Sequence, residues 1–557
     1  MKYRLSGIKT DIDEPIGSLP RITAKKAGIK ESDISFFEIR KRSIDSRKKP
    51  HIQFVYAVDF VTDKKLNGRK IKNLTEVDEA AEAAAVKPTE CGTDQLESRP
   101  VIIGAGPCGL FAALELAKAG YKPLLIERGP AMSGRVEAVE KFRKDRVLDP
   151  EANMLFGEGG AGTFSDGKLA TGIKDGLIRK VLAEFRDAGA GDDIMYLAKP
   201  HIGTDVLRSV IVNIRNKIIE LGGAVRFNTK VDRVIAYGGR LQALDLYGPH
   251  PETGKISEYR ISADAVILAI GHSARDTFEM LNEESVEMAQ KPFSIGVRIE
   301  HPQSLIDASQ YGKENLDRVT DAVSASAQAG KLPPADYSIN YKASNGRGVY
   351  SFCMCPGGEV VVCSTKDGEL CVNGMSNRKR DSGTANSGIL CDVRTSDFGS
   401  DDVLAGVRFQ EKYERLAFLN GGSNFMAPSC SMKEFLSITT AENSFENSFT
   451  HEDPSILSPA ERVCASLPDF AAEAIREAVP DFARKIHGYD DPDAVITAVE
   501  TRSSSPVRIL RDAGGESNVK GLYPAGEGAG YAGGITSAAC DGIRAAWHII
   551  EKYKRPE

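Results

Sequence analysis

The sequence predicts an α/β protein in which a small N-terminal α+β domain precedes a Rossmann-like domain that carries an inserted, mostly antiparallel β domain. Three features predict this architecture: a βαβ unit with a glycine turn at 101–129, alternating strands from residue 293 onward, and a glycine loop with a long helix at 521–550. A chain of 557 residues is too long for one core, so two to four domains are expected.

The composition indicates a globular protein, because 41% of the residues are hydrophobic and 27% are charged. A net charge of −6 gives no overall electrostatic case for binding nucleic acid. No apolar run reaches the roughly 20 residues of a membrane span, and the first residues lack the apolar core of a secretory signal. Ten cysteines without the spacing of a disulfide framework favour reduced thiols and a cytoplasmic location.

Residues 1–75 are expected to form the small α+β domain. A helix is predicted at 22–27 and strands at 33–42 and 51–61, which fits a ferredoxin-like βαββαβ arrangement. A basic cluster between the strands could contact phosphates or, as we favour, belong to a solvated hairpin: Arg40, Lys41, Arg42, Arg47, Lys48 and Lys49. Residues 76–98 are rich in Ala and Glu, which predicts a linker with a helical part.

The segment 101–129, VIIGAGPCGLFAALELAKAGYKPLLIERG, predicts a bound dinucleotide. Gly104 allows a tight strand-to-helix turn, Gly106 lets the backbone approach a pyrophosphate, and Gly109 lets helix and strand pack closely. The N-terminus of the helix presents N–H groups to the phosphates. Glu127 lies about 20 residues beyond the glycines, where an acid accepts hydrogen bonds from a ribose.

Three further stretches indicate backbone lying against a ligand. The loop 153–169 holds five glycines in NMLFGEGGAGTFSDGKL, which allows direct contact with a planar group or a phosphate. The apolar run 263–271 fits a strand buried on both faces and ends in Gly271. The segment 521–550 predicts a strand, a glycine loop and a helix whose N-terminus would direct its dipole at an anion.

The inserted region, 291–495, is expected to be mostly antiparallel sheet. Strands at 350–354 and 359–364 flank Pro-Gly-Gly and predict a hairpin. A helix is predicted at 408–419, with Phe409, Leu416 and Leu419 on its buried side.

Together these pieces resemble flavoproteins of the two-dinucleotide-binding-domain class. The matching motifs are GAGPCG with Glu127, NTKVDRV, ILAIGHS and YPAGEGAG, where the class has Asp at the position of Glu527. More specifically, KRSIDSRKKP, FGEGGAGTFSDGKL, HIGTD, KPFSIGVRIEHP, YSFCMCPGGEVVV, ETRSSSPVRI and GEGAGYAGGI resemble an uncharacterised bacterial family of FAD-dependent dehydrogenases, similar in outline to geranylgeranyl-reductase-like proteins. The resemblance spans nearly the whole chain. It implies a Rossmann-like FAD-binding domain at 99–290 and 496–557 and a substrate-side domain at 291–495.

The resemblance also implies three groups of contacts to FAD. The glycine turn would meet the pyrophosphate through Gly104, Ala105, Gly106, Pro107, Cys108 and Gly109. The adenosine half would lie near Glu127, Arg128, Arg135 and the backbone of Val231. The flavin, the ribityl chain and the neighbouring phosphates would be lined by Gly159, Gly160, Gly162, Thr163, Ser165, Lys168, Gly271, Gly526, Glu527, Gly533, Gly534 and Ile535.

Five residues are candidates for chemistry, each with a structural alternative. Lys168 and Arg298 could bind an anion or form ion pairs with other residues of the chain, and His272 could donate a proton or only a loop hydrogen bond. Cys353 and Cys355 would face the same side of a strand, where they could be a redox dithiol or ordinary buried thiols.

Other residues are expected to line the site without acting on substrate. Cys108 lies at a predicted helix N-terminus, which would lower its pKa. The segment ETRSSSPVR could reach the open face of the flavin ring through four residues: Glu500, Thr501, Arg502 and Arg508. We expect no metal site.

The leading hypothesis is an FAD-dependent oxidoreductase that passes a hydride through flavin N5 to or from a small molecule. No second GxGxxG followed by an acid occurs, so a dedicated NAD(P)H domain is not expected, although a nicotinamide could dock transiently. Two alternatives stay open: an RNA-directed flavoprotein that uses the basic N-terminal domain, and a flavin-binding protein without turnover. The sequence leaves the substrate, the reductant and the oligomeric state open.

Overall fold

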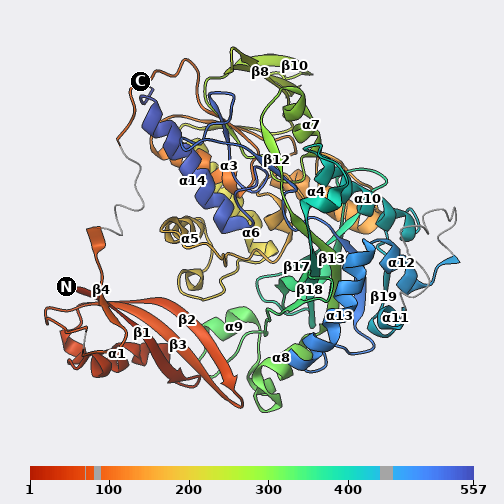
Figure 1. Cartoon of the computed structure of the whole chain (residues 1–557). Coiled ribbons are helices and arrows are strands. Elements are labelled where there is room, and N and C mark those ends of the chain that lie inside the picture. The colour runs from red at the N-terminus through yellow and green to blue at the C-terminus, as the bar shows by residue number, and fades with distance from the viewer. Residues whose placement is uncertain (69, 81–89, 439–455, 557) are drawn as a thin grey trace.

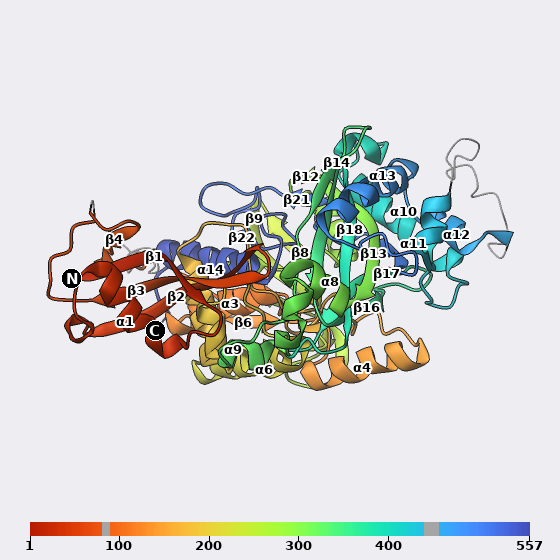
Figure 2. The same cartoon turned by 90° about the horizontal axis from the view of Figure 1, so that it is seen from below.

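The computed structural model describes residues 1–68, 70–80, 90–438 and 456–556. The N-terminal unit lies at one end of an elongated molecule, and helices α11 (Met432–Ser437) and α12 (Pro459–Ala465) lie at the other (Figure 1 and Figure 2). No helix among the described residues is both long and apolar enough to cross a membrane.

The N-terminal unit is a four-stranded antiparallel sheet with one α-helix. Its elements are β1 (Lys2–Asp11), α1 (Leu19–Ala27), β2 (Phe36–Lys48), β3 (His51–Val61) and β4 (Leu74–Glu76). The strand order β2-β3-β1-β4 is that of a ferredoxin-like sheet, but between β3 and β4 the described residues contain no second helix. Most of the predicted linker helix falls on residues 81–89, which lie outside the described residues.

The Rossmann-like domain is built on a five-stranded parallel sheet of order β22-β11-β5-β6-β7. Its strands are β5 (Val101–Ile103), β6 (Leu124–Ile126), β7 (Ala224–Arg226), β11 (Val266–Leu268) and β22 (Leu522–Pro524). All but β7 are buried throughout, as expected of apolar strands covered on both faces.

Helices and a second sheet cover this parallel sheet. One core packs against α3 (Pro107–Lys118), α5 (Leu177–Asp187), α6 (Thr204–Glu220) and α14 (Ile535–Lys552). The other core joins the sheet to an antiparallel sheet and a helix: β8 (Lys230–Tyr237), β9 (Arg240–Pro249), β10 (Ile256–Ser262) and α7 (Arg275–Glu283). Helix α4 (Met132–Asp145) lies after β6.

The inserted domain is a six-stranded antiparallel sheet of order β14-β15-β18-β13-β20-β19. Its strands are β13 (Phe293–Pro302), β14 (Asn340–Lys342), β15 (Gly348–Cys355), β18 (Thr384–Val393), β19 (Ser429–Ser431) and β20 (Val495–Glu500). Strand β20 therefore crosses the predicted domain boundary at residue 495. The other helices of the domain are α8 (Gln303–Tyr311), α9 (Ala322–Ala327), α10 (Ala405–Asn420) and α13 (Asp469–Lys485).

The predicted hairpin around Pro-Gly-Gly is wrong. Strand β15 pairs with β14 and β18, whereas β16 (Gly358–Cys363) pairs with β17 (Cys371–Ser376). The glycine turn therefore passes the chain from one sheet to another. A second two-stranded sheet, β12 (Met288–Gln290) with β21 (Val507–Ile509), lies where the inserted domain joins the Rossmann-like domain.

The predicted buried side of the helix at 408–419 is also partly wrong. Leu419 is 48% exposed, whereas Gln410 and Glu414 on the same helix, α10, are fully buried. The polar side chains face inward because they hold arginines from other segments. Glu414 accepts two hydrogen bonds of 2.8 Å from Arg275 of α7.

Candidate functional site

The glycine turn after β5 is held by the acid at the end of β6. Both carboxylate oxygens of Glu127 accept backbone N–H groups at 2.9 Å, one from Ala105 and one from Gly129. A Cβ on Gly109 would lie 1.9 Å from the carbonyl oxygen of Gly104, so only glycine lets α3 approach the turn this closely. The turn is thus fixed at the carboxyl end of the parallel sheet, where such folds bind their ligands.

A cavity of about 380 Å³ opens in front of this turn. Its Rossmann-side wall includes most of the predicted cofactor residues: Gly104, Gly106, Pro107, Cys108, Glu127, Arg128, Gly160, Gly162, Ser165, Lys168, Val231, Gly271, Glu527, Gly533, Gly534 and Ile535. The sheet domain and the segment after it supply the opposite wall through Phe352, Cys353, Asn373, Glu500 and Arg502. The remaining predicted residues lie outside this lining: Ala105, Gly109, Arg135, Gly159, Thr163 and Gly526.

The glycines on the wall leave room that the chain itself does not fill. A Cβ on Gly271, Gly533 or Gly534 would meet no atom within 4 Å, and one on Gly106 would meet only Gly160, at 3.8 Å. Gly106 has φ −73° and ψ −178°, which any residue adopts, so neither strain nor crowding explains glycine at this position. This cradle fits the close backbone approach of a dinucleotide.

Arg135 holds the glycine-rich loop and does not itself line the cavity. It is fully buried in α4 and donates to the carbonyl oxygens of Asn153, Met154, Glu158 and Gly160, at 2.6 to 3.2 Å. Burial lowers its pKa to about 10, against the attraction of nearby carboxylates. The side chain therefore fixes the backbone that forms one wall.

Asp541 of α14 supports the second glycine loop, and no sequence motif pointed to it. Its carboxylate accepts the N–H of Gly526 at 2.7 Å and pairs with Arg511 at 2.8 Å. Cys108 lies against Gly526. Burial, reinforced by Asp541, raises the pKa of Cys108 well above its usual value, so the predicted lowering by the helix N-terminus is wrong.

His272 and Glu527 lie together on the cavity wall. The His272 Nδ1 atom is 3.6 Å from the Glu527 carboxylate, and the Nε2 atom is buried without a hydrogen-bond partner among the described residues. The late acid of this sequence thus faces a histidine on the cavity wall.

Arg298 is an internal ion-pair residue. It is fully buried, its Nε lies 2.6 Å from the Glu500 carboxylate, and it donates to the Cys353 carbonyl oxygen at 3.0 Å. Of the pair, Glu500 lines the cavity. Burial raises the pKa of Glu500 to about 7, although Arg298 opposes the shift. A carboxyl group with this pKa can hold or release a proton near neutral pH.

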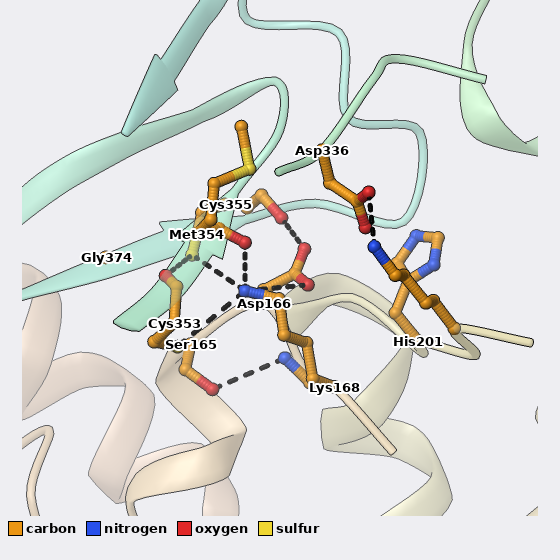
Figure 3. Close-up of polar contacts among 12 residues, drawn as sticks. Ser165, Asp166, Lys168, His201, Asp336, Cys353, Met354, Cys355 and Gly374 are labelled. Carbon is orange, nitrogen blue, oxygen red and sulfur yellow. Dashed lines mark hydrogen bonds and ion pairs between the residues drawn. The ribbon is translucent and has the colours of Figure 1, made fainter. Parts of the chain in front are cut away.

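Lys168 lies between Asp166 and the two cysteines (Figure 3). Its Nζ is 3.8 Å from the Asp166 carboxylate and 3.8 and 3.7 Å from the sulfurs of Cys353 and Cys355, and it donates to the Met354 carbonyl oxygen. Burial would lower the pKa of Lys168, but the sulfurs and Asp166 outweigh it and raise the pKa. The amine is therefore a fixed positive charge at the cavity.

The two cysteines do not simply share one face of a regular strand. The pairing of β15 with β18 shifts register between Phe352 and Cys355, and Cys353 has φ 43°. Cys353 is half-buried on the cavity wall, whereas Cys355 is fully buried. The period-two rule used for the sequence fails here because it assumes an unbroken strand.

Two buried ion clusters brace the cavity, and no sequence pattern indicated the pairings within them. Arg502 on the wall pairs with the fully buried Glu414 at 2.8 Å. Behind Lys168, Asp166 accepts hydrogen bonds from Arg380 and Ser376. Burial would raise the pKa of Asp166, but Arg380 and other cations lower it to about 2. These partners are far apart in sequence, so only the fold brings them together.

The basic cluster of the N-terminal domain is largely engaged within the chain. Arg40 lies 3.4 Å from Asp59, and Arg47 lies 2.8 Å from Asp45. Arg42 is 7% exposed and stacks on an aromatic ring. The cluster presents less free positive charge than its sequence indicates.

Three parts of the chain match models of known protein families. Residues 292–503 match the family model "FAD-dependent protein, C-terminal domain-like", residues 102–162 match "NAD(P)-binding Rossmann-like domain", and residues 3–61 match a domain of unknown function. The chain is 30% identical over 118 residues to a thiamine thiazole synthase of Archaeoglobus fulgidus, covering 21% of this chain and 45% of that protein.

A full-length relative and a solved structure complete the comparison. The structure of a geranylgeranyl bacteriochlorophyll reductase-like protein from Thermoplasma acidophilum is 14% identical, covers 82% of this chain and 78% of that chain, and has a TM-score of 0.33. A protein of Clostridium beijerinckii named "Uncharacterized protein" is 43% identical over 563 residues, covering 100% of both chains. The chain belongs to an uncharacterised family of FAD-dependent proteins.

Proposed function

We propose that this protein binds FAD in the 380 Å³ cavity and is an oxidoreductase that transfers a hydride to or from a small molecule. The observation that supports the proposal is the composition of the cavity: one wall is lined by glycines that leave room for a dinucleotide, and the other presents Glu500. When bound, the flavin would supply the hydride chemistry at N5. The chain's own residues then have to bind the flavin, orient the substrate and exchange a proton with it.

The residues on the wall fit these tasks. The first turns of α3 and α14 present backbone N–H groups that helices leave without internal partners, and their dipoles favour negative charge. Gly106 would meet the pyrophosphate, and Gly533 and Gly534 would lie at the flavin ring. Glu500, with a pKa of about 7, would exchange the proton that accompanies reduction or oxidation of the substrate.

The first test is the identity of the cofactor. The full-length protein is purified, denatured and analysed for released flavin, and we expect FAD. A protein that carries no flavin and binds no added FAD would refute the proposal. The holoprotein is then mixed anaerobically with NADH, NADPH and a panel of organic hydride donors while flavin absorbance is followed. Bleaching by a nicotinamide would indicate a reductase, and bleaching by an organic compound alone would indicate a dehydrogenase.

The second test concerns the proton. Glu500→Gln should slow turnover with the identified donor and remove a titration near pH 7 from the rate profile, while leaving bound FAD in place. Glu300→Gln is the matched control, because Glu300 is a half-buried carboxylate of the same sheet that does not line the cavity. An unchanged pH profile in Glu500→Gln would contradict the role of this residue.

A further inference from the structure

Cys353 differs from the other cysteines in its surroundings. Its side chain is half-buried and lies on the cavity wall, while the neighbouring Cys355 is fully buried. Cys353 also has a φ of 43°, a left-handed conformation that residues other than glycine rarely adopt. Such strained residues cluster at functional sites.

One ammonium group contacts both sulfurs of this pair. The Lys168 Nζ atom lies 3.8 Å from the Cys353 sulfur and 3.7 Å from the Cys355 sulfur (Figure 3). The Cys355 thiol also donates to the Cys353 carbonyl oxygen at 3.2 Å, and the same oxygen accepts from Arg298 at 3.0 Å. The contacts place both cysteines beside two cations, and each cation also lies close to a carboxylate: Lys168 is 3.8 Å from Asp166 and Arg298 is 2.6 Å from Glu500.

The pKa values of the two thiols are shifted in opposite directions. A hydrogen bond from Cys355 lowers the pKa of Cys353 despite burial, and Lys168 and Arg298 add to the lowering. The same hydrogen bond, together with burial, raises the pKa of Cys355. The pair therefore combines a more acidic thiol at the cavity with a less acidic thiol beside it. By contrast, burial raises the pKa of Cys363 to about 12.

We propose that Cys353 and Cys355 are a dithiol that reacts with hydroperoxides, with Cys353 as the attacking residue and Cys355 as the resolving residue. The Cys353 thiolate attacks one peroxide oxygen, so an S–O bond forms and the O–O bond breaks. The leaving alkoxide or hydroxide takes a proton from Lys168, which solvent later restores. The Cys355 sulfur then attacks the Cys353 sulfur, and the S–O oxygen leaves as water with the Cys355 proton.

The reaction balances and fits the geometry. Two thiols lose two electrons and become a disulfide, while the peroxide gains them and becomes an alcohol and water. Both sulfurs lie within 3.8 Å of the Lys168 Nζ atom, so the two side chains converge on one point at the cavity. A hydroperoxide is small enough for the cavity. The proposal goes beyond hydride transfer and does not depend on it, because no flavin takes part.

Peroxide treatment of the wild-type protein is the direct test. The full chain, with and without bound flavin, is treated with one equivalent of hydrogen peroxide, alkylated and mapped by mass spectrometry. We expect a 353–355 disulfide in both samples. Cys355→Ser should instead leave a sulfenic acid on Cys353 that dimedone traps, and Cys353→Ser should show neither product. Free, alkylated thiols at both positions of the treated wild-type protein would overturn the proposal.

Alkylation rates test the role of Lys168 as a positioning residue. At pH 6.5 an ordinary thiol is about 1% ionised, so after allowing for the weaker nucleophilicity of acidic thiolates Cys353 should react with iodoacetamide roughly tenfold faster than the exposed thiol of Cys91. Lys168→Met should move the pH midpoint of the Cys353 reaction upward, and Lys168→Arg should restore it. Cys363→Ser is the control and should change neither the midpoint nor disulfide formation. An identical midpoint in Lys168→Met would refute the role of the amine.

Discussion

The substitution Gly106→Ala distinguishes a role of this glycine in FAD binding from a role in the stability of the fold. The added methyl would meet only the Cα atom of Gly160, at 3.8 Å, and the backbone conformation suits alanine. Because Gly106 caps α3, we expect a loss of less than about 1 kcal/mol in the free energy of unfolding. If FAD binds as proposed, however, the methyl would stand where its pyrophosphate approaches. Loss of one charge-assisted hydrogen bond costs about 1.5 to 3 kcal/mol, or roughly 10- to 150-fold in Kd.

The assay pairs thermal unfolding of the flavin-free protein with titration of added FAD, followed by flavin fluorescence. Gly109→Ala is the contrasting variant, because its methyl would lie 1.9 Å from the Gly104 carbonyl oxygen. That clash should destabilise the fold by about 1 to 3 kcal/mol or more, as overpacked cores do, and abolish FAD binding with it. Gly106→Ala should lose affinity alone.

Two results would refute this reasoning. If Gly106→Ala binds FAD as tightly as the wild-type protein, the turn does not meet the pyrophosphate. If Gly106→Ala unfolds as readily as Gly109→Ala, the glycine at 106 serves the fold and the open space beside it has another cause.

Three further predictions concern charge. Glu414→Gln should destabilise the protein by about 3 to 5 kcal/mol, because the buried Arg502 loses its counter-charge and Arg275 keeps only Glu369 and the more distant Glu411; thermal unfolding is compared with the exposed control Glu473→Gln. The folded-state pKa of Glu500 is raised to about 7 from 4.5, so its stabilising contribution is complete below pH 4.5 and lost as the pH rises through 7. Glu500→Gln should flatten that decline by up to about 3 kcal/mol. Two arginines of the basic segment 40–49, Arg40 and Arg47, are paired with acids of the same domain, and we expect no salt-sensitive RNA binding.

Each of these predictions has a contrary outcome. Equal unfolding temperatures for the Glu414 and Glu473 variants would mean that the buried cluster adds nothing to stability. Parallel stability curves for the wild-type protein and Glu500→Gln across neutral pH would show that Glu500 titrates normally. RNA binding that weakens steeply between about 50 and 200 mM salt would revive the RNA-directed alternative.

Local patterns in the sequence were enough to predict the parallel sheet, the glycine turns and most of one cavity wall. Gly104, Gly106 and Glu127 are related by short, fixed spacings, because a βαβ unit closes on itself within about 30 residues. Apolar strands such as Val266–Leu268 can also be predicted locally, because a strand buried on both faces appears in the sequence as a continuous apolar run. The resemblance to a flavoprotein family rests on these local motifs.

Only the tertiary structure decided what stands opposite that wall. Glu500 and Cys353 on that opposite wall come from distant segments, and the pKa of Glu500 follows from burial and from the neighbouring Arg298. The hairpin failed as a prediction because a strand's partner is chosen by packing across the domain, and the buried side of α10 failed because distant arginines draw Glu414 inward. The spacing of residues in the sequence determines the local conformation of the chain within a βαβ unit or a helix. Charge, burial and strand pairing depend on which remote segments meet, and this follows from the fold.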